Sequence, residues 1–251
     1  MEGAELGAFM IAACTFGVLL DHPSFPVRGL LPDPLRRVLT GIAMGATAIA
    51  IVYSPWGKRS GAHFNPAVTL TFWRLGKIEK WDAFFYVGAQ FAGGIAGVVL
   101  ASLVMGALVA DPAVNYVATV PGPTGIPLAF VAEVLMSFLM MSMILRATNA
   151  PHLARFTGIF AGILVATFIS LEAPVSGMSI NPARTLGSAV SARLFTALWL
   201  YFLAPVLGMI LAAEIYRRRG TARVLCAKLH HQNSARCIFR CGYASPTVLP
   251  S

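Results

Sequence analysis

Charged side chains are scarce in this sequence. They make up 12% of its 251 residues, about half of the roughly 25% that is typical of soluble domains. Hydrophobic residues make up 57%, and the mean hydropathy is +0.73, so there is too little polar side chain to cover a surface facing water. The composition excludes an ordinary soluble enzyme, a nucleic-acid-binding domain and a disordered chain, and it leaves a polytopic membrane protein. The short alternating segments of a membrane barrel are also missing, so the spans should be helices.

Cysteine and acidic residues are also rare, which limits what the C-terminal part can do. The four cysteines are too few and too badly placed for a disulfide framework. Residues 217–251 contain seven Lys or Arg residues and no acidic residue. Such basic residues beside a span fix topology and contact anionic lipid, and we expect no nucleic acid as partner. We expect residues 217–251 to form a flexible basic tail.

Six apolar blocks are long enough to cross a bilayer as helices. Positively charged loop residues are concentrated on the side of the N-terminus, and the first block lacks the basic start of a cleavable signal peptide. The positive-inside rule therefore places both termini in the cytoplasm. The six expected spans are about 4–20, 35–53, 83–109, 128–146, 156–172 and 196–216.

The chain contains two copies of one motif. Residues 60–69 read Ser-Gly-Ala-His-Phe-Asn-Pro-Ala-Val-Thr, and residues 176–185 read Ser-Gly-Met-Ser-Ile-Asn-Pro-Ala-Arg-Thr. Each repeat, about 1–110 and about 126–216, holds three spans. Because three is an odd number, the second repeat enters the membrane from the opposite side.

In each copy, the proline of the motif is well placed to begin a short helix. The two runs extend from Pro66 to about Leu75 and from Pro182 to about Ala192, and each is about half a membrane long. If they meet end to end at their N-termini, both positive dipole ends point at the bilayer centre. Irregular backbone at that depth must line a wet cavity or be buried in protein, so this arrangement implies a polar path.

With both motifs placed in this way, residues 1 to about 216 resemble the aquaporin, or major intrinsic protein, family. The resemblance implies an all-α membrane protein with six spans and two re-entrant half-helices in an inverted 3+3 repeat. It implies a passive water channel of the bacterial water-channel-like branch, no enzymatic activity and no cofactor. It also implies a homotetramer with one pore per chain, in the inner membrane of a bacterium. The pore motifs would be Asn65, Pro66, Ala67, Asn181, Pro182 and Ala183.

The resemblance gives each motif a role in excluding protons. Asn65 and Asn181 would each present an amide donor at the pore centre. A water molecule that accepts from both has its own protons pointing outward, which interrupts a proton wire. Arg184 and the two dipole ends would add a barrier to cations. The resemblance further implies a ladder of backbone carbonyl acceptors, formed by Gly61, Ala62, His63, Gly177, Met178 and Ser179.

The selectivity constriction of the family maps onto four positions. Arg184 would be its fixed cation, with Met178 and Ile169 beside it. The fourth residue is Met44 or Gly45, depending on the length of the following loop, and we favour Met44. Water-selective members usually have His in place of Ile169 and a small residue in place of Met178, so this ring is more apolar than theirs.

The markers of permeant class therefore conflict. The apolar ring makes glycerol or another small neutral solute the alternative permeant. Against it, glycerol-conducting members usually carry Asp where this chain has Thr185, and a basic residue where it has Ala189. We therefore favour water.

Two carboxylates in apolar spans are candidates for a functional role. Glu5 and Glu133 could be ion-coupling sites of a secondary transporter, or each could accept backbone N–H bonds from the re-entrant loop of its own repeat. Their occurrence once per repeat favours the structural role. A scaffold protein with an occluded pore is a further alternative, which the intact Arg184 and the two motifs disfavour.

The tail contains a possible zinc-binding set. Its spacing does not match the usual arrangement of two cysteines followed by two histidines, and we therefore expect no metal site. The residues are Cys226, His230, His231, Cys237 and Cys241.

Overall fold

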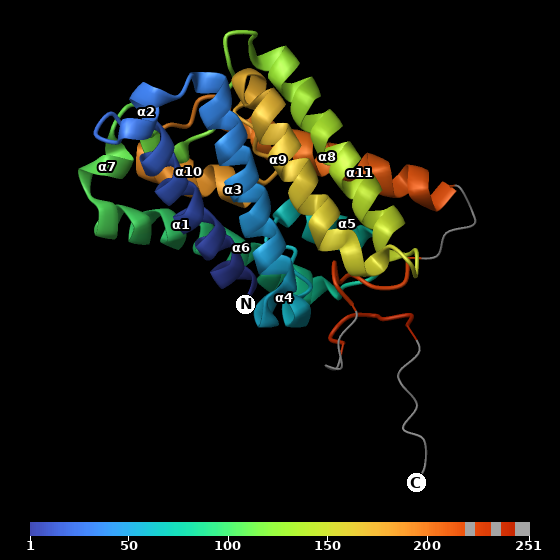
Figure 1. Ribbon diagram of the computed structural model, residues 1–251. Coiled ribbons are helices and arrows are strands. Elements are labelled where there is room, and N and C mark those ends of the chain that lie inside the picture. The colour runs from blue at the N-terminus through green and yellow to red at the C-terminus, as the bar shows by residue number, and fades with distance from the viewer. Residues whose placement is uncertain (219–223, 232–236, 244–251) are drawn as a thin grey trace.

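The computed structural model describes residues 1–218, 224–231 and 237–243, and within them the chain is helical (Figure 1). Six helices are long and apolar enough to cross a membrane. This confirms the prediction of an all-helical protein with six spans. The spans are α1 (Glu2–Asp21), α3 (Asp33–Tyr53), α6 (Lys80–Met105), α8 (Ile126–Thr148), α9 (Thr157–Ser176) and α11 (Leu198–Arg218).

The third span is shorter than its apolar run. The sequence predicted a helix over 83–109, but α6 ends at Met105 because Gly106 adopts a φ of 58° and a ψ of −132°. A separate turn, α7 (Ala107–Ala110), follows this break. Hydropathy alone could not reveal the break, since both sides of it are apolar.

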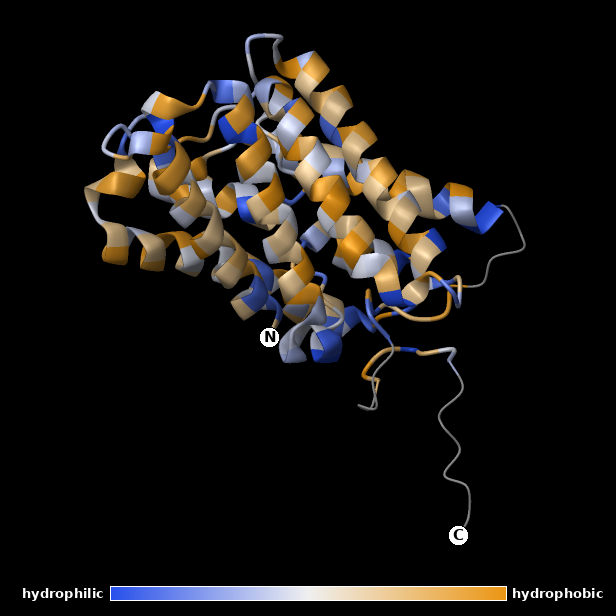
Figure 2. Ribbon diagram, in the orientation of Figure 1, coloured by the Kyte–Doolittle hydropathy of each residue, from blue (hydrophilic) through white to orange (hydrophobic). Residues whose placement is uncertain are grey.

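Short elements join the spans at the two ends of the bundle, where hydrophilic residues gather (Figure 2). Their positions follow the proline- and glycine-rich gaps of the sequence, as expected for residues that start or stop helices. Besides α7, they are α2 (Pro26–Leu30), α4 (Pro55–Ser60) and the 3₁₀ turns η1 (Asn115–Val117) and η2 (Ala154–Phe156).

Two half-length helices lie inside the bundle. They are α5 (Pro66–Arg74) and α10 (Pro182–Ala192), and each begins at the proline that follows the motif asparagine. Both contact α6 and α11, and they contact each other. The two motifs of the sequence therefore meet in the interior.

Glycines allow the spans to cross closely. A Cβ atom on Gly93 of α6 would lie 1.9 Å from the carbonyl oxygen of Gly3 on α1. A Cβ atom on Gly45 of α3 would lie 2.5 Å from the carbonyl oxygen of Gly162 on α9. Neither position can hold a larger residue without moving backbone.

We expected a flexible basic tail, but the described parts of the tail are bonded to the bundle. They lie at the end where the chain begins (Figure 1). There the backbone N–H of Leu225 donates to Asn149 Oδ1 at 2.6 Å, and the hydroxyl of Tyr243 donates to the carbonyl of Thr148 at 2.7 Å. The tail is thus fixed to the end of α8.

Candidate channel site

A cavity of about 420 Å³ lies in the interior of the bundle. We call one end the far mouth, and it is lined by Asp21, Asp33, Arg36 and Arg37. The opposite end, lined by Leu229 of the tail, is called the tail-side mouth. Between the two mouths, the lining includes both motif asparagines, so the cavity follows the path that the sequence predicted.

Each motif asparagine caps its own half-helix. The Oδ1 atom of Asn65 accepts the backbone N–H of Ala67 at 2.9 Å. The Oδ1 atom of Asn181 accepts the N–H groups of Ala183 and Arg184 at 3.1 and 3.2 Å. These bonds satisfy N–H groups that the first turn of a helix leaves unpaired, and they turn each NH₂ group away from its own helix.

The same two side chains also tie the repeats together. Asn65 Nδ2 donates to the carbonyl of Ile180 at 2.7 Å, and Asn181 Nδ2 donates to the carbonyl of Phe64 at 2.8 Å. A carboxamide has two N–H donors, so each asparagine uses one in this exchange and retains one. Both retained hydrogens belong to residues that line the cavity.

The loops before the two half-helices have matching backbone conformations. Positive φ angles occur at Gly61, Ala62 and Phe64 in the first loop, and at Gly177, Met178 and Ile180 in the second. Left-handed conformations cost a non-glycine residue about 1–3 kcal/mol each and persist only where the surroundings fix them. The loops must therefore be held from outside.

In the second repeat, one buried carboxylate holds the loop. Glu133 accepts the backbone N–H groups of Ser179 and Ile180, both at 2.7 Å. It also accepts the hydroxyl of Ser176 at 2.7 Å. This is the type of contact that we expected for Glu133.

In the first repeat, Glu2 makes the equivalent contacts. It accepts the backbone N–H groups of His63 at 3.0 Å and of Phe64 at 2.7 Å. It also accepts Gln90 Nε2 at 2.6 Å. The sequence analysis did not single out Glu2, although it lies one helical turn before Glu5 and so on a neighbouring part of the same face.

The prediction for Glu5 was wrong in its detail. Its bond to the loop comes from the hydroxyl of Ser60, at 2.6 Å, rather than from a backbone N–H. The analogy with Glu133 rested on an Ala-Glu pair present in both repeats. That pair aligns the sequences, but the backbone N–H groups lie one turn nearer the N-terminus of α1, where Glu2 reaches them.

Five of the six proposed ladder residues line the cavity, and Gly61 does not. The carbonyl of Gly61 instead accepts the backbone N–H of Leu229 in the tail, at 3.1 Å. Leu229 itself lines the cavity. The five that line the cavity are Ala62, His63, Gly177, Met178 and Ser179.

The residues of the expected constriction converge on the cavity, with one exception. Arg184, Met178, Ile169 and Met44 all line it. Gly45 does not, because its face of α3 packs against α9. The Nη1 atom of Arg184 is buried and has no hydrogen-bond partner among the described residues. Arg184 as a whole is only partly buried and lines the cavity.

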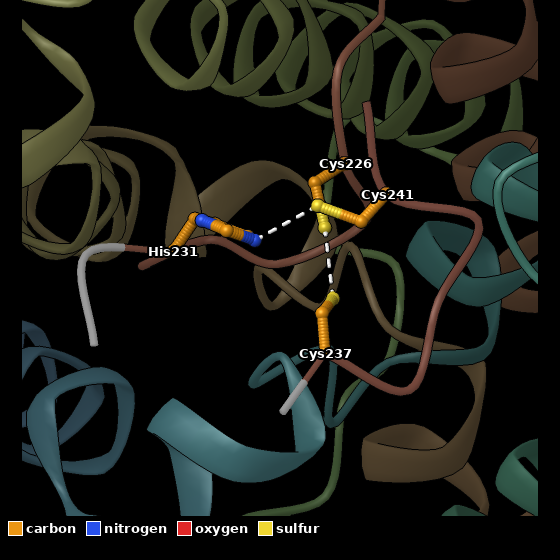
Figure 3. A group of neighbouring side chains, drawn as sticks. All are labelled: Cys226, His231, Cys237 and Cys241. Atoms are coloured by element: carbon orange, nitrogen blue, oxygen red, sulfur yellow. Dashed lines mark hydrogen bonds between the residues drawn. The ribbon is translucent and has the colours of Figure 1, made fainter. Parts of the chain in front are cut away.

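Four tail side chains also gather in one place (Figure 3). Their ligand-type atoms, from Cys226, His231, Cys237 and Cys241, all lie within 4.8 Å of one another. Burial raises the pKa of the Cys226 thiol and lowers the pKa of the His231 imidazole. His230, the fifth residue of the set, contributes no atom to this group and packs against the ring of Tyr53 at 4.9 Å.

Comparison with known proteins finds relatives in plants and bacteria. The chain is 35% identical to "Putative aquaporin NIP4-1" of Arabidopsis thaliana over 176 residues, which are 70% of this chain and 60% of that protein. It is 36% identical to "Aquaporin NIP2-2" of Zea mays over 216 residues, covering 84% of this chain and 71% of the relative. It is also 36% identical to "Glycerol uptake facilitator protein-like 6" of Lactiplantibacillus plantarum over 189 residues, covering 72% of this chain and 84% of the relative. Several of the plant relatives are longer, and the chain spans about 60% of their length.

The fold is also that of a solved channel. The X-ray structure of the aquaglyceroporin from Plasmodium falciparum matches with a TM-score of 0.68 at 18% identity, covering 86% of this chain and 92% of that one. At this identity the match shows the fold alone. The family model described as "Major intrinsic protein" matches residues 7–216. The chain therefore belongs to the major intrinsic protein family, whose members are membrane channels for water or small neutral solutes and not enzymes.

Proposed function

We propose that this chain is a passive transmembrane water channel that excludes protons and ions. The observation that carries the proposal is the crossed pair of Asn65 and Asn181, each of which caps its own half-helix and donates to the loop of the other repeat. This exchange fixes both amides beside the cavity with one N–H each to spare. A rigid pair of donors at the crossing point of two half-helices suits a small neutral molecule with an acceptor oxygen.

The geometry accounts for proton exclusion as follows. A water molecule whose oxygen accepts from both amides has its own two hydrogens directed toward the two mouths. It cannot accept a proton from a neighbouring water, so a proton cannot hop past this point. The N-terminal ends of α5 and α10 add positive potential at the same place, and Arg184 adds a full positive charge in the constriction.

The second candidate is a facilitator of glycerol or another small neutral solute. The observation that favours it is the apolar character of the constriction, where Met44, Met178 and Ile169 accompany Arg184. Such a wall tolerates the CH groups of a polyol, while Arg184 can bind its hydroxyl groups. One relative also carries the name of a glycerol uptake facilitator.

A coupled secondary transporter has less support. Glu5 and Glu133 were its candidate ion sites, and neither lines the cavity. Both carboxylates are engaged with loop residues, Glu5 with Ser60 and Glu133 with Ser176, Ser179 and Ile180. Support of the loops is the role that these bonds favour.

We further propose a homotetramer in a bacterial inner membrane, with both termini in the cytoplasm. In support, α6 exposes a row of large apolar side chains that lipid or neighbouring subunits must cover. They include Phe84, Phe85, Leu103 and Val104. Blue-native electrophoresis of the protein in mild detergent tests the subunit number.

Stopped-flow light scattering on proteoliposomes tests the permeant. Protein purified with reductant and a metal chelator is reconstituted and shocked with sucrose, and then with glycerol. We expect fast shrinkage in sucrose that Val68→Trp abolishes, because Val68 lines the cavity beside the first motif. Val104→Trp is the matched control, since Val104 is 85% exposed on the outside of α6, and it should leave the rate unchanged.

Fast re-swelling in glycerol would favour the second candidate over strict water selectivity. Equal rates in empty vesicles and in vesicles with wild-type protein, in both gradients, would contradict the open-channel proposal.

A further inference from the structure

The four clustered tail residues form a set of ligands of the kind that zinc prefers. The Sγ atoms of Cys226 and Cys237 lie 3.5 Å apart, and Cys241 Sγ lies 3.0 Å from His231 Nε2. In a tetrahedral site with a Zn–S bond of about 2.3 Å, neighbouring ligand atoms lie about 3.8 Å apart. The four atoms thus need only small adjustments to surround one ion. Three thiols and one imidazole also match a common structural zinc site in composition.

The described tail residues have no regular secondary structure and are held by individual contacts with the channel. The described stretches 224–231 and 237–243 contain no helix or strand, and one backbone hydrogen bond, from the N–H of Gly242 to the carbonyl of Leu225 at 2.7 Å, joins them directly. A bound metal can supply the folding free energy that such a segment lacks. A disulfide is the competing use of these cysteines, but four convergent ligands exceed what one disulfide needs. On the cytoplasmic side, where we propose that the tail lies, thiols remain reduced.

The cluster lies in the part of the tail that is hydrogen-bonded to the tail-side mouth. His63 Nε2 donates to the carbonyl of Ala227 at 2.7 Å, because that oxygen can only accept. The backbone N–H of Leu229 donates to Gly61 at 3.1 Å, and Lys228 Nζ donates to the carbonyl of Lys58 at 2.9 Å. Between Cys226 and His231, the tail is thus bonded to the loop that precedes the first motif.

The second described stretch of the tail covers the same end of the cavity. The ring of Phe239 stacks on His63, with centroids 5.7 Å apart. Arg240 forms an ion pair with Glu79, and its backbone N–H donates to Lys77 at 3.2 Å. Phe239 and Arg240 lie between Cys237 and Cys241, so the residues that would hold the ion directly flank those that contact the channel.

We propose that Cys226, His231, Cys237 and Cys241 bind one Zn²⁺ ion, which fastens the tail across the tail-side mouth of the pore. With the ion bound, Leu229 stays in the lining and the path is narrowed at this end. Without the ion, the two stretches lose the link between their side chains, and the individual contacts with the channel can break so that the tail leaves. The proposal reverses our expectation from the sequence, which rested on spacing between ligands. Spacing has no bearing on ligands that the channel surface itself brings together.

Cobalt binding tests the site itself, independently of transport. Full-length protein is freed of metal and titrated with Co²⁺, which gives strong visible absorption in a tetrahedral thiolate site. We expect one equivalent per chain in the wild type and in Cys14→Ala, which removes the one cysteine outside the cluster. Cys237→Ser and Cys241→Ser should each weaken binding or abolish the thiolate bands, and Zn²⁺ should displace the Co²⁺.

Three results would overturn the metal site. They are the absence of tetrahedral Co²⁺ bands in the wild type, unchanged bands in both serine variants, and a Cys226–Cys237 disulfide that persists in reductant. Gel filtration confirms that each variant is folded before its spectrum is interpreted.

Water flux tests the effect of the ion on the mouth, and this part rests on the proposed channel function. Vesicles are loaded on both sides with Zn²⁺ or with chelator. We expect wild type and Cys14→Ala to conduct several-fold faster with chelator, and Cys237→Ser to be fast in both conditions. Equal fast rates for every variant in both conditions would overturn the fastened tail and leave the channel intact. Slow rates throughout would contradict the channel function, and the Co²⁺ spectra would still decide the metal site.

Discussion

The two re-entrant loops share one backbone conformation but are held in place differently. Both have positive φ angles at the same three relative positions, and both end in an asparagine that bonds to the opposite loop. In the second repeat, Glu133 accepts both loop N–H groups and the serine hydroxyl, and Glu172 also lies within hydrogen-bond distance of that hydroxyl, at 2.9 Å. In the first repeat, Glu2 and Glu5 divide these bonds between them. The backbone is therefore the constrained feature, and more than one arrangement of carboxylates can support it.

The two ends of the cavity also differ from each other. Arg184 follows the second motif, whereas Val68 occupies the matching position of the first. On the Val68 side, the tail bonds to Gly61 and adds Leu229 to the lining. We infer that the symmetric parts form the junction of the two half-helices at the centre. The asymmetric parts, Arg184 at one end and the tail at the other, regulate what passes each mouth.

The largest expected effect comes from removing the carboxylate that accepts two backbone N–H groups of the second loop. In Glu133→Gln, whichever way the amide turns, its NH₂ group faces a donor that the carboxylate accepted. We expect a loss of about 3 kcal/mol in the free energy of unfolding, the upper end of the cost of an unpaired buried polar group. Thermal unfolding in detergent measures it. A melting temperature equal to that of the wild type would contradict the account of this loop.

A smaller loss should follow from separating α1 and α6. Gly93→Ala would place a methyl group against the carbonyl of Gly3, the residue next to Glu2, and push Glu2 away from the first loop. We expect about 2 kcal/mol of destabilisation, within the range for overpacked cores. Gly88→Ala on the same helix is the matched control, because nothing lies within 4 Å of its Cβ position. Equal melting temperatures for the two variants would refute the close crossing.

The asymmetry between the mouths can be removed by Arg184→Val, which copies Val68 into the second repeat. We expect cation leak to rise about tenfold, which corresponds to about 1.4 kcal/mol of barrier height. Arg184→Lys keeps the charge and should keep the leak low. Potassium efflux from loaded vesicles measures both variants, and an equal leak in the two would mean that the charge of Arg184 is not the barrier.

The smallest effect should follow from Glu5→Gln. The Oε1 atom can still accept the Ser60 hydroxyl, and the amide nitrogen replaces Oε2, which has no hydrogen-bond partner among the described residues. We expect a change within about 0.5 kcal/mol. If Glu5→Gln unfolds at as low a temperature as Glu133→Gln, then Glu5 supports the loop more than its bonds indicate.

The features that the sequence predicted correctly are local ones. A proline at the first helical position and an asparagine before it specify where α5 and α10 begin, and both signals lie within three residues. Long apolar runs likewise specify the spans. The carboxylate that accepts the N–H groups of the first loop cannot be found from local sequence. Glu2 accepts from His63 and Phe64, which lie more than 60 positions later in the chain. Only the packing of α1 decides between Glu2 and Glu5.

The same limit applies to the constriction and to the tail. Met44 and Gly45 are neighbours in the sequence and point about 100° apart around the helix. An error of one residue in the assumed loop length therefore replaces the residue that lines the cavity with one that packs against α9. The tail contacts residues more than 160 positions earlier in the sequence. It has no helical or strand periodicity from which its place could be predicted.

The central claim is that the Asn65 and Asn181 junction passes water and stops protons. Water flow and proton leak can both be measured in one preparation of chelator-treated proteoliposomes that contain a pH-sensitive dye. An osmotic gradient is applied first and a pH gradient second. The account predicts rapid water flow, with a proton leak no greater than in empty vesicles. A proton leak that rises together with water flow would contradict it.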